Sequence, residues 1–107
     1  MTNAIVVTTT TSSKDEARSI AEAVLTERLA ACVQMHPVTS HFHWNGALHS
    51  EDEIMLTFKS RLDLYSRLEA AIVKHHSYEV PEIVATPIEM GHPAYLDWID
   101  TETGAEG

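Results

Sequence analysis

The chain has 107 residues, of which 44% are hydrophobic and 21% are charged, and this is the size and balance of one ordinary globular domain. Sixteen acidic residues against seven basic ones give a net charge of −9, so we expect no nucleic acid and no anionic membrane as partners, whereas cations suit such a surface. The single cysteine, Cys32, excludes an internal disulfide and suits a reducing compartment. No signal-peptide pattern opens the chain, and no apolar run approaches the ~20 residues that span a bilayer. We therefore expect a cytoplasmic protein.

The first part of the chain predicts a strand followed by a helix. Residues 4–10 are rich in β-branched side chains and carry no charge, which is typical of a strand that is buried on nearly both faces. Ser13 and Glu16 have the spacing of a capping box and indicate the start of a helix. Apolar residues then recur at helical spacing on one face, and we expect this helix to end near Ala30.

The central part predicts a long β-hairpin. Residues 32–44 and 47–59 form its two arms, and the Asn-Gly pair at 45–46 is a strong signal for a two-residue type I′ turn. Pro37 indicates a bulge or an edge position in the first arm. The acidic residues 51–53 favour an exposed or edge stretch of the second arm.

The last part predicts a second helix, a fourth strand and a short terminal helix. Ser60 can cap the second helix, whose apolar residues fall close to one face. Pro81 marks a loop, and residues 83–88 are expected to form the fourth strand. Pro93 suits the first position of a last helix. The polar residues from about 102 to 107 are expected to fray.

This order of elements predicts a single α+β domain over residues 1–107. Two split βαβ units give a ferredoxin-like βαββαβ sandwich, with an antiparallel sheet, both main helices on one face, a long central hairpin and a short C-terminal helix. The opposite face of such a sheet is left uncovered, and a long two-stranded ribbon is only marginally stable alone. Both features predict an oligomer in which neighbours cover the bare face and pair with the ribbon.

Stretches along the whole chain share one pattern. They are Glu27-Arg28-Leu29-Ala30-Ala31-Cys32-Val33, Thr39-Ser40 with Trp44 and Gly46, Lys59, His75-His76-Ser77-Tyr78-Glu79-Val80-Pro81-Glu82-Ile83 and Tyr95-Leu96-Asp97-Trp98-Ile99. In this order and spacing they resemble the CutA family of divalent-cation tolerance proteins. The resemblance implies a ferredoxin-like fold, a compact homotrimer and a role in tolerance to divalent cations, of which copper is the one most often named.

The resemblance also implies a metal site at a histidine pair, which corresponds to His75 and His76. Cu(II) or another divalent cation would be the ligand. The family's cysteine at the end of the first strand corresponds to Thr9 here, and a hydroxyl is a poorer ligand than a thiolate for Cu(I). Adjacent residues of a helix project ~100° apart, so the two histidines can share an ion only if the helix frays. The alternative is that they interact favourably with the helix dipole.

A second pair of histidines, His41 and His43, is predicted on one face of the hairpin. Such a pair can chelate a transition metal if a third ligand comes from a neighbour. The expected register places His43 opposite Leu48 and His41 opposite Ser50, and it places His49 on the other face. A solvated polar face is the alternative, and it is the one that we favour from the sequence.

A cleft between subunits is the natural place for a small ligand in such an oligomer. Trp44 and Tyr78 could line it, with Lys59 and Glu82 as charged partners. Cys32 is a further candidate, although a buried thiol that behaves as a small hydrophobic side chain is its ordinary role. The alternative is that Tyr78 fixes the loop and a contact between subunits.

No catalytic motif is evident: there is no Gly-rich phosphate loop, G-x-S-x-G, H-E-x-x-H or C-x-x-C. We therefore expect a protein that is not an enzyme. Two functions stay open. One is a trimeric divalent-cation tolerance protein that binds Cu(II) or a similar ion and takes part in the response to metal ions. The other is a trimeric small-molecule sensor or signalling scaffold with its ligand cleft between subunits.

Overall fold

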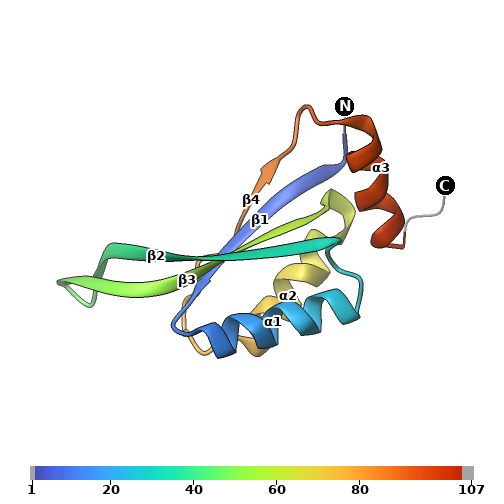
Figure 1. Cartoon of the computed structure of the whole chain (residues 1–107). Helices are drawn as coiled ribbons and strands as arrows, with labels where there is room; N and C mark the ends of the chain where they lie inside the picture. The colour runs from blue at the N-terminus through green and yellow to red at the C-terminus, as the bar shows by residue number, and fades with distance from the viewer. Residues whose placement is uncertain (1, 105–107) are drawn as a thin grey trace.

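The computed structural model describes residues 2–104 and arranges them as a four-stranded sheet with a pair of helices on one side (Figure 1). The elements in chain order are β1 (Ala4–Thr11), α1 (Lys14–Thr26), β2 (Cys32–Trp44), β3 (Ala47–Arg61), η1 (Leu62–Leu64), α2 (Tyr65–His75), β4 (Val84–Pro87) and α3 (Pro93–Glu102). The strand order is β2-β3-β1-β4, and each neighbouring pair is antiparallel. The predicted α+β class and the ferredoxin-like order of strands are confirmed.

The hydrophobic core lies between one face of the sheet and the helices α1 and α2. Strand alternation sends one set of apolar residues of β1 and β3 to this face, where the apolar stripes of both helices cover them. The strand residues of this core are Ile5, Val7, Leu56 and Phe58, and the helix residues are Ala17, Ile20, Ala21, Val24, Leu68, Ala71 and Ile72. Burial of this apolar surface is the main favourable contribution to folding.

The opposite face of the sheet, called the outer face below, carries the alternate residues of the strands, such as Cys32 and Lys59. Helix α3 packs against one end of it, where Ile99 is fully buried. Figure 1 shows α1 and α2 together on the other side of the sheet, so these two helices leave the outer face uncovered. Within residues 2–104, none of the helices has the length and apolar character needed to cross a membrane.

The starts of the two main helices differ in how well the sequence predicts them. At α1, the Ser13 hydroxyl accepts the N–H of Glu16 at 3.1 Å, as expected. The prediction that Ser60 caps the second helix is wrong. Ser60 lies in β3, where it is fully buried and its hydroxyl donates to the Leu29 carbonyl at 2.6 Å. Helical backbone begins only at Leu62, with a single 3₁₀ turn before α2.

Helix α1 ends at Thr26, earlier than the expected end near Ala30. Arg28 adopts a left-handed backbone conformation with φ of 56°, and the N–H of Leu29 turns back to the carbonyl of Val24 at 3.0 Å. This is a Schellman motif, which satisfies the free carbonyls at the helix end. The buried Leu29 then carries the chain directly into the core.

The side chain of Arg28 connects this turn to α3. Its Nη1 donates to the Glu102 carbonyl at 2.9 Å. Next to this contact, Arg61 Nε donates to the hydroxyl of the buried Thr103 at 2.8 Å. The region expected to fray from about residue 102 therefore contributes Thr103 to the packing, because Arg61 supplies a partner that the sequence pattern does not reveal. Residues 105–107 lie outside the described part.

The β2–β3 hairpin extends far beyond the rest of the sheet. Pairing of β1 with β3 ends at Thr11 and Ile54, so residues 38–53, called the ribbon below, continue as two strands alone. Figure 1 shows the ribbon projecting from the rest of the protein. The molecule as a whole, ribbon included, is 49 Å long. The Asn-Gly pair at 45–46 has positive φ at both residues, and the predicted register is confirmed. β2 is an edge strand with unbroken register, so Pro37 marks an edge and not a bulge.

Thr9 offers a test of the packing of β1. It is fully buried, and within the described residues its hydroxyl has no hydrogen-bond partner. A buried hydroxyl without a partner costs ~1–3 kcal/mol, and valine keeps the same branched shape. We therefore expect Thr9→Val to raise the free energy of unfolding by about 1 kcal/mol in urea denaturation.

Thr11→Val is the matched control, because the equally buried hydroxyl of Thr11 donates to the Ser13 carbonyl at 3.0 Å. This variant should lose stability. If both variants lowered the free energy of unfolding, the hydroxyl of Thr9 would have a hydrogen-bond partner in the folded protein.

Candidate functional site

A groove of about 990 Å³ lies between the ribbon and the loop that joins α2 to β4. This loop, residues 76–83, passes the end of β1 and comes to lie beside the part of β3 that β1 leaves unpaired. Aromatic, acidic and imidazole side chains dominate the lining, which includes His41, Phe42, His43, Trp44, His49, Glu51, Glu53, Tyr78, Glu79 and Glu82. Among the described residues that line the groove there is no lysine or arginine. The groove therefore favours a cation or an aromatic ligand over an anion.

The ribbon supplies one wall of the groove. Phe42 and His49 are directly opposite in the β2–β3 ladder, and their rings stack with centroids 5.6 Å apart and an interplanar angle of 14°. His49 Nε2 donates to the Trp44 carbonyl at 3.2 Å, which fixes the orientation of the imidazole ring. The side chain of Trp44 lies on the same ribbon face, and the residue is 41% exposed. This wall therefore presents aromatic surface that a ligand or another chain can cover.

The loop is attached to the ribbon by Tyr78. Its hydroxyl donates to Glu53 Oε2 at 2.6 Å. Burial, followed by this hydrogen bond and the negative charge of Glu53, raises the pKa of Tyr78 well above its ordinary value, so the hydroxyl keeps its proton. Glu53 itself is only 8% exposed. Residues 51–53 were expected in an exposed or an edge stretch, and the edge is what the structure has, because only β2 pairs with β3 there.

A second set of polar contacts holds the start of the loop. The ring of His76 is fully buried; its Nε2 donates to the Thr10 carbonyl at 2.8 Å, and its Nδ1 accepts the N–H of Tyr78 at 3.1 Å. The Glu16 carboxylate accepts the N–H of Ser77 at 2.6 Å and the hydroxyl of Ser77 at 2.9 Å. Desolvation alone would raise the pKa of Glu16, but the neighbouring groups, with the hydrogen bonds from Ser77 foremost among them, together keep the pKa below its usual value.

The predicted metal pair separates in the structure. His75 is the last residue of α2 and is exposed, whereas His76 leaves the helix with an extended ψ of 139°. The helix therefore ends between the two residues, as a shared ion would require, but backbone groups already occupy both ring nitrogens of His76. Thr9, which corresponds to the family's cysteine, is buried in β1. The assignment of a metal to His75 and His76 stays a prediction.

A cluster of three or more His, Cys, Asp or Glu side chains that could hold a metal ion is not present in residues 2–104. Any cation in the groove would therefore have water or a second copy of the chain among its ligands. Such open sites exchange their ions readily, because few protein ligands must be displaced.

Three of the five residues predicted for a ligand cleft meet in the groove: Trp44, Tyr78 and Glu82. Cys32 and Lys59 are opposite each other at the other end of the β2–β3 pair. Cys32 and Trp44 are twelve residues apart along one strand, which corresponds to roughly 40 Å. One chain alone therefore does not bring the five residues into one cleft.

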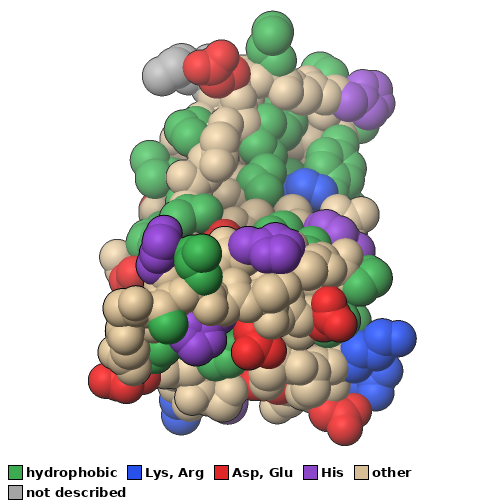
Figure 2. Space-filling view, turned by 90° about the vertical axis from the view of Figure 1, so that its left-hand side faces the viewer, with side chains coloured by type: hydrophobic (Ala, Val, Ile, Leu, Met, Phe, Trp, Pro, Cys, Tyr) green, Lys and Arg blue, Asp and Glu red, His purple; other side chains and the backbone are tan. Residues whose placement is uncertain are grey.

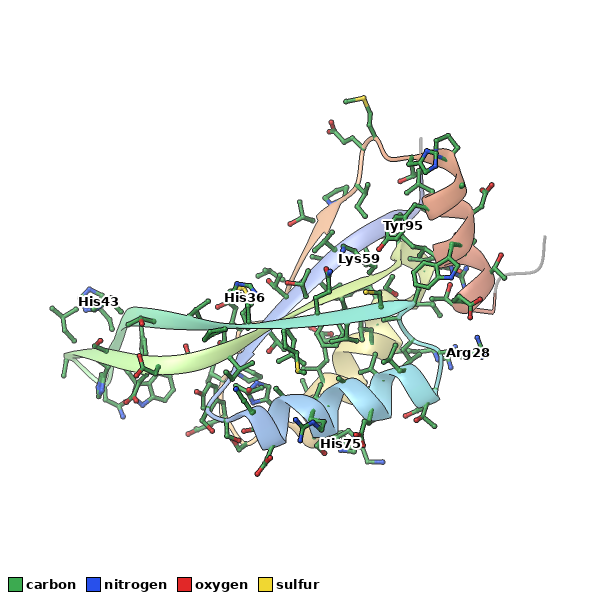
Figure 3. All side chains as sticks on the ribbon, viewed as in Figure 1. Arg28, His36, His43, Lys59, His75 and Tyr95 are labelled. Carbon is green, nitrogen blue, oxygen red and sulfur yellow. The ribbon has the colours of Figure 1, made fainter. Side chains whose placement is uncertain are left out.

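Lys59 has its own surroundings on the outer face, beneath α3. Its Nζ donates to Gln34 Oε1 at 3.0 Å and lies 5.9 Å from the centroid of the Tyr95 ring. Figure 3 shows Lys59 and Tyr95 close together where α3 meets the sheet, far from His43 at the end of the ribbon. Cys32, the strand partner of Lys59, is partly buried and carries a free thiol.

Several residues of the groove were not among those predicted for the ligand cleft. Phe42, His49 and Glu51 share a ribbon face with Trp44, and the register set by the Asn-Gly turn could have identified them. The role of Glu16 left no such signal, because its partner Ser77 is sixty-one residues away. The groove thus depends on contacts that join both ends of the chain.

The hydrogen bond between Tyr78 and Glu53 can be tested directly. Tyr78→Phe leaves a buried carboxylate without its donor, so we expect the free energy of unfolding to fall by about 1–3 kcal/mol. Tyr95→Phe is the matched control, because Tyr95 is 38% exposed and its ring stays in place; its effect should be within about 0.5 kcal/mol. Equal stability of the two variants in urea denaturation would mean that the Tyr78 contact contributes nothing.

Comparison with known proteins places these features in a family. Residues 5–102 match the family described as CutA1 divalent ion tolerance protein. The divalent-cation tolerance protein CutA of Thermus thermophilus is 42% identical over 100 residues, covering 92% of this chain and 97% of the relative. The protein of the same name from Yersinia pestis is 41% identical over 99 residues, covering 92% and 83%.

Solved structures agree with this match. The periplasmic divalent cation tolerance protein CutA from Archaeoglobus fulgidus superposes with a TM-score of 0.92 at 35% identity, covering 94% of this chain and 98% of that one. CutA1 from Oryza sativa superposes with a TM-score of 0.93 at 33% identity, covering 98% and 97%. Matches of this length and similarity, over the same fold, lead to one conclusion: this chain belongs to the CutA1 divalent ion tolerance protein family.

Proposed function

We propose that this chain acts in tolerance to divalent metal ions, as a cytoplasmic homotrimer that binds Cu(II) or another divalent cation and catalyses no reaction. Its family membership supports the metal-ion role, because the relatives are named for divalent-cation tolerance. The net charge of −9 and the single cysteine support a cation ligand and a reducing compartment.

The observation that carries this proposal is the composition of the groove. Glu51, Glu79 and Glu82 are exposed carboxylates at its surface, and the imidazole of His49 lies among them. Carboxylate oxygens and imidazole nitrogens are the ordinary protein ligands of divalent cations. No positive side chain competes for these carboxylates within the described lining, so their charge remains available to an ion.

Uncovered surface supports the trimer. The outer face away from α3 and the end of the ribbon beyond the loop of residues 76–83 have no covering element among residues 2–104, and Leu48 and Val84 expose large hydrophobic side chains there. Trp44 lies on the same face of the β2–β3 pair as Cys32 and Lys59, at the opposite end. If the ribbon end of one copy lay against this opposite end of the next, all the residues of the predicted ligand cleft would meet.

Metal binding is tested by titrating the protein with Mn(II) and with Cu(II) in a calorimeter. Glu51→Gln with Glu82→Gln removes two charges from the groove and should weaken the affinity for Mn(II) about tenfold or more. Glu22→Gln with Glu27→Gln removes the same charge from α1 and its C-cap, and it should leave the affinity unchanged.

Two results would contradict this assignment. Identical Mn(II) isotherms for the groove variant and the wild type would remove the groove as the site. Loss of binding in His75→Ala would instead place the ion at the α2 terminus, where the family resemblance puts it.

A trimeric small-molecule sensor or signalling scaffold remains the second candidate, because three aromatic side chains, those of Phe42, Trp44 and Tyr78, line the groove. A preformed aromatic wall suits an organic ligand better than a hydrated ion. In this case metal would be incidental. Thermal-shift screening separates the two, since stabilisation grows with ligand concentration relative to its dissociation constant. A metabolite that stabilised the protein more than any metal would favour the sensor.

The trimer itself has a simple test. Light scattering should give a mass three times that of one chain at micromolar concentration. Trp44→Glu with Leu48→Glu places charge on the exposed end of the ribbon and should shift the mass towards one chain, because burying these charges is unfavourable. Lys14→Glu, on the exposed start of α1, is the control. A wild-type protein that scatters as a single folded chain would refute the trimer.

A further inference from the structure

His41 and His43 form a second group of potential ligands on the ribbon. They alternate with Phe42 along β2, so their side chains leave the ribbon on the face opposite to Phe42 and Trp44. Both residues are exposed, and their partners across the ladder are Ser50 and Leu48. Figure 2 looks onto the hairpin end of the molecule and shows several histidine side chains there, beside acidic ones.

The spacing of the pair suits chelation. Two residues along a strand separate side chains on one face by roughly 6.6 Å, and a metal–imidazole bond is about 2.0–2.1 Å long. The two rings can therefore lean towards each other and bind one ion between them. The ladder with β3 already fixes the backbone of both residues, so binding orders only the side chains.

The pair also has free nitrogens, unlike His76. Backbone groups hold both ring nitrogens of His76, and His49 donates to the Trp44 carbonyl. Among the hydrogen bonds of residues 2–104, none involves the rings of His41 and His43. Their nitrogens can therefore bind an ion without breaking an internal contact.

The charges around the pair favour a cation. Residues 38–53 contain no lysine or arginine and include three carboxylates, so nothing on the ribbon repels a positive ion. Asp52 shares the face of the two histidines, where its Oδ1 accepts the hydroxyl of Thr39 at 3.2 Å. Ser50 is the direct partner of His41. These oxygens can hold the water that completes the coordination of a bound ion.

We propose that His41 and His43 chelate a divalent transition-metal ion on the ribbon, with Cu(II) bound most tightly. Two imidazoles with water in the remaining positions match the tetragonal coordination of Cu(II), which also heads the affinity order of the first-row divalent ions. The site deepens the proposed role in metal tolerance and rests on it for its physiological meaning. Both histidines border the groove. Their imidazole nitrogens suit Cu(II), whereas the groove carboxylates suit harder ions such as Mn(II).

Calorimetric titration with Cu(II) tests the site in the full-length protein. His41→Ala with His43→Ala should weaken Cu(II) binding at this site roughly 100-fold, and either single change should cause most of the loss, because the second ligand acts only through its proximity to the first. His36→Ala with His92→Ala removes two other exposed histidines and should leave the Cu(II) isotherm unchanged. Asn in place of Ala at 41 and 43 provides a second, polar variant should the first fold poorly.

A spectroscopic readout separates binding by the two imidazoles from binding by the groove carboxylates. Electron paramagnetic resonance of Cu(II) should show nitrogen couplings that disappear in the 41/43 variant and persist in the Glu51/Glu82 variant. Mn(II) binding should persist in the 41/43 variant. Unchanged Cu(II) affinity and nitrogen couplings in the 41/43 variant would refute the ribbon site, even where Mn(II) binding upheld the groove. If the Glu51/Glu82 variant bound Mn(II) as tightly as the wild type, while the nitrogen couplings still depended on His41 and His43, only the groove site would be refuted.

Discussion

The difference in length between β1 and β3 determines the shape of this protein. β1 has eight residues and β3 has fifteen, so the outer half of β3 has only β2 as a strand neighbour. The chain turns into α1 where β1 stops, and the space that β1 would have occupied is open to the loop of residues 76–83. A longer β1 would pair with the ribbon and remove the groove. The shortness of one strand thus creates both the projecting ribbon and the surface on which we place the function.

Polar contacts, rather than apolar packing, hold the loop in this space. Tyr78 binds Glu53 of β3, His76 binds the carbonyl of Thr10 in β1, and Glu16 of α1 binds Ser77. Three elements therefore fix the loop through directional bonds, and each buried group has a partner. Satisfied buried polar networks specify one arrangement, because any other leaves groups unpaired. The groove wall is consequently ordered before a ligand arrives, which lowers the entropic cost of binding.

The sequence predicted best where the signal was local. The Asn-Gly turn implied the register of the whole hairpin, because a type I′ turn allows one pairing of the flanking strands. Ser60 misled because its role depends on the Leu29 carbonyl, thirty-one residues away. The burial of Glu53 had no local signal for the same reason, since it depends on Tyr78. For the site, the predicted arms of the hairpin already placed Cys32 and Lys59 a strand's length from Trp44. The contact that brings Tyr78 and the loop to the ribbon left no local signal, because its partner Glu53 is twenty-five residues away.

In the turn after α1, the backbone and the side chain of Arg28 have opposing requirements. Glycine is the residue that the left-handed backbone at position 28 would favour, because it has no Cβ to strain. The left-handed conformation is less favourable for arginine, but the guanidinium of Arg28 donates a hydrogen bond to the Glu102 carbonyl in α3. Helices α1 and α3 lie on opposite sides of the sheet, so the Arg28 side chain connects the two sides past the edge of the sheet. Helix α3 makes few other contacts with the first half of the chain. The hydrogen bond of Arg28 therefore holds α3 in place, although it requires a slightly strained backbone at Arg28.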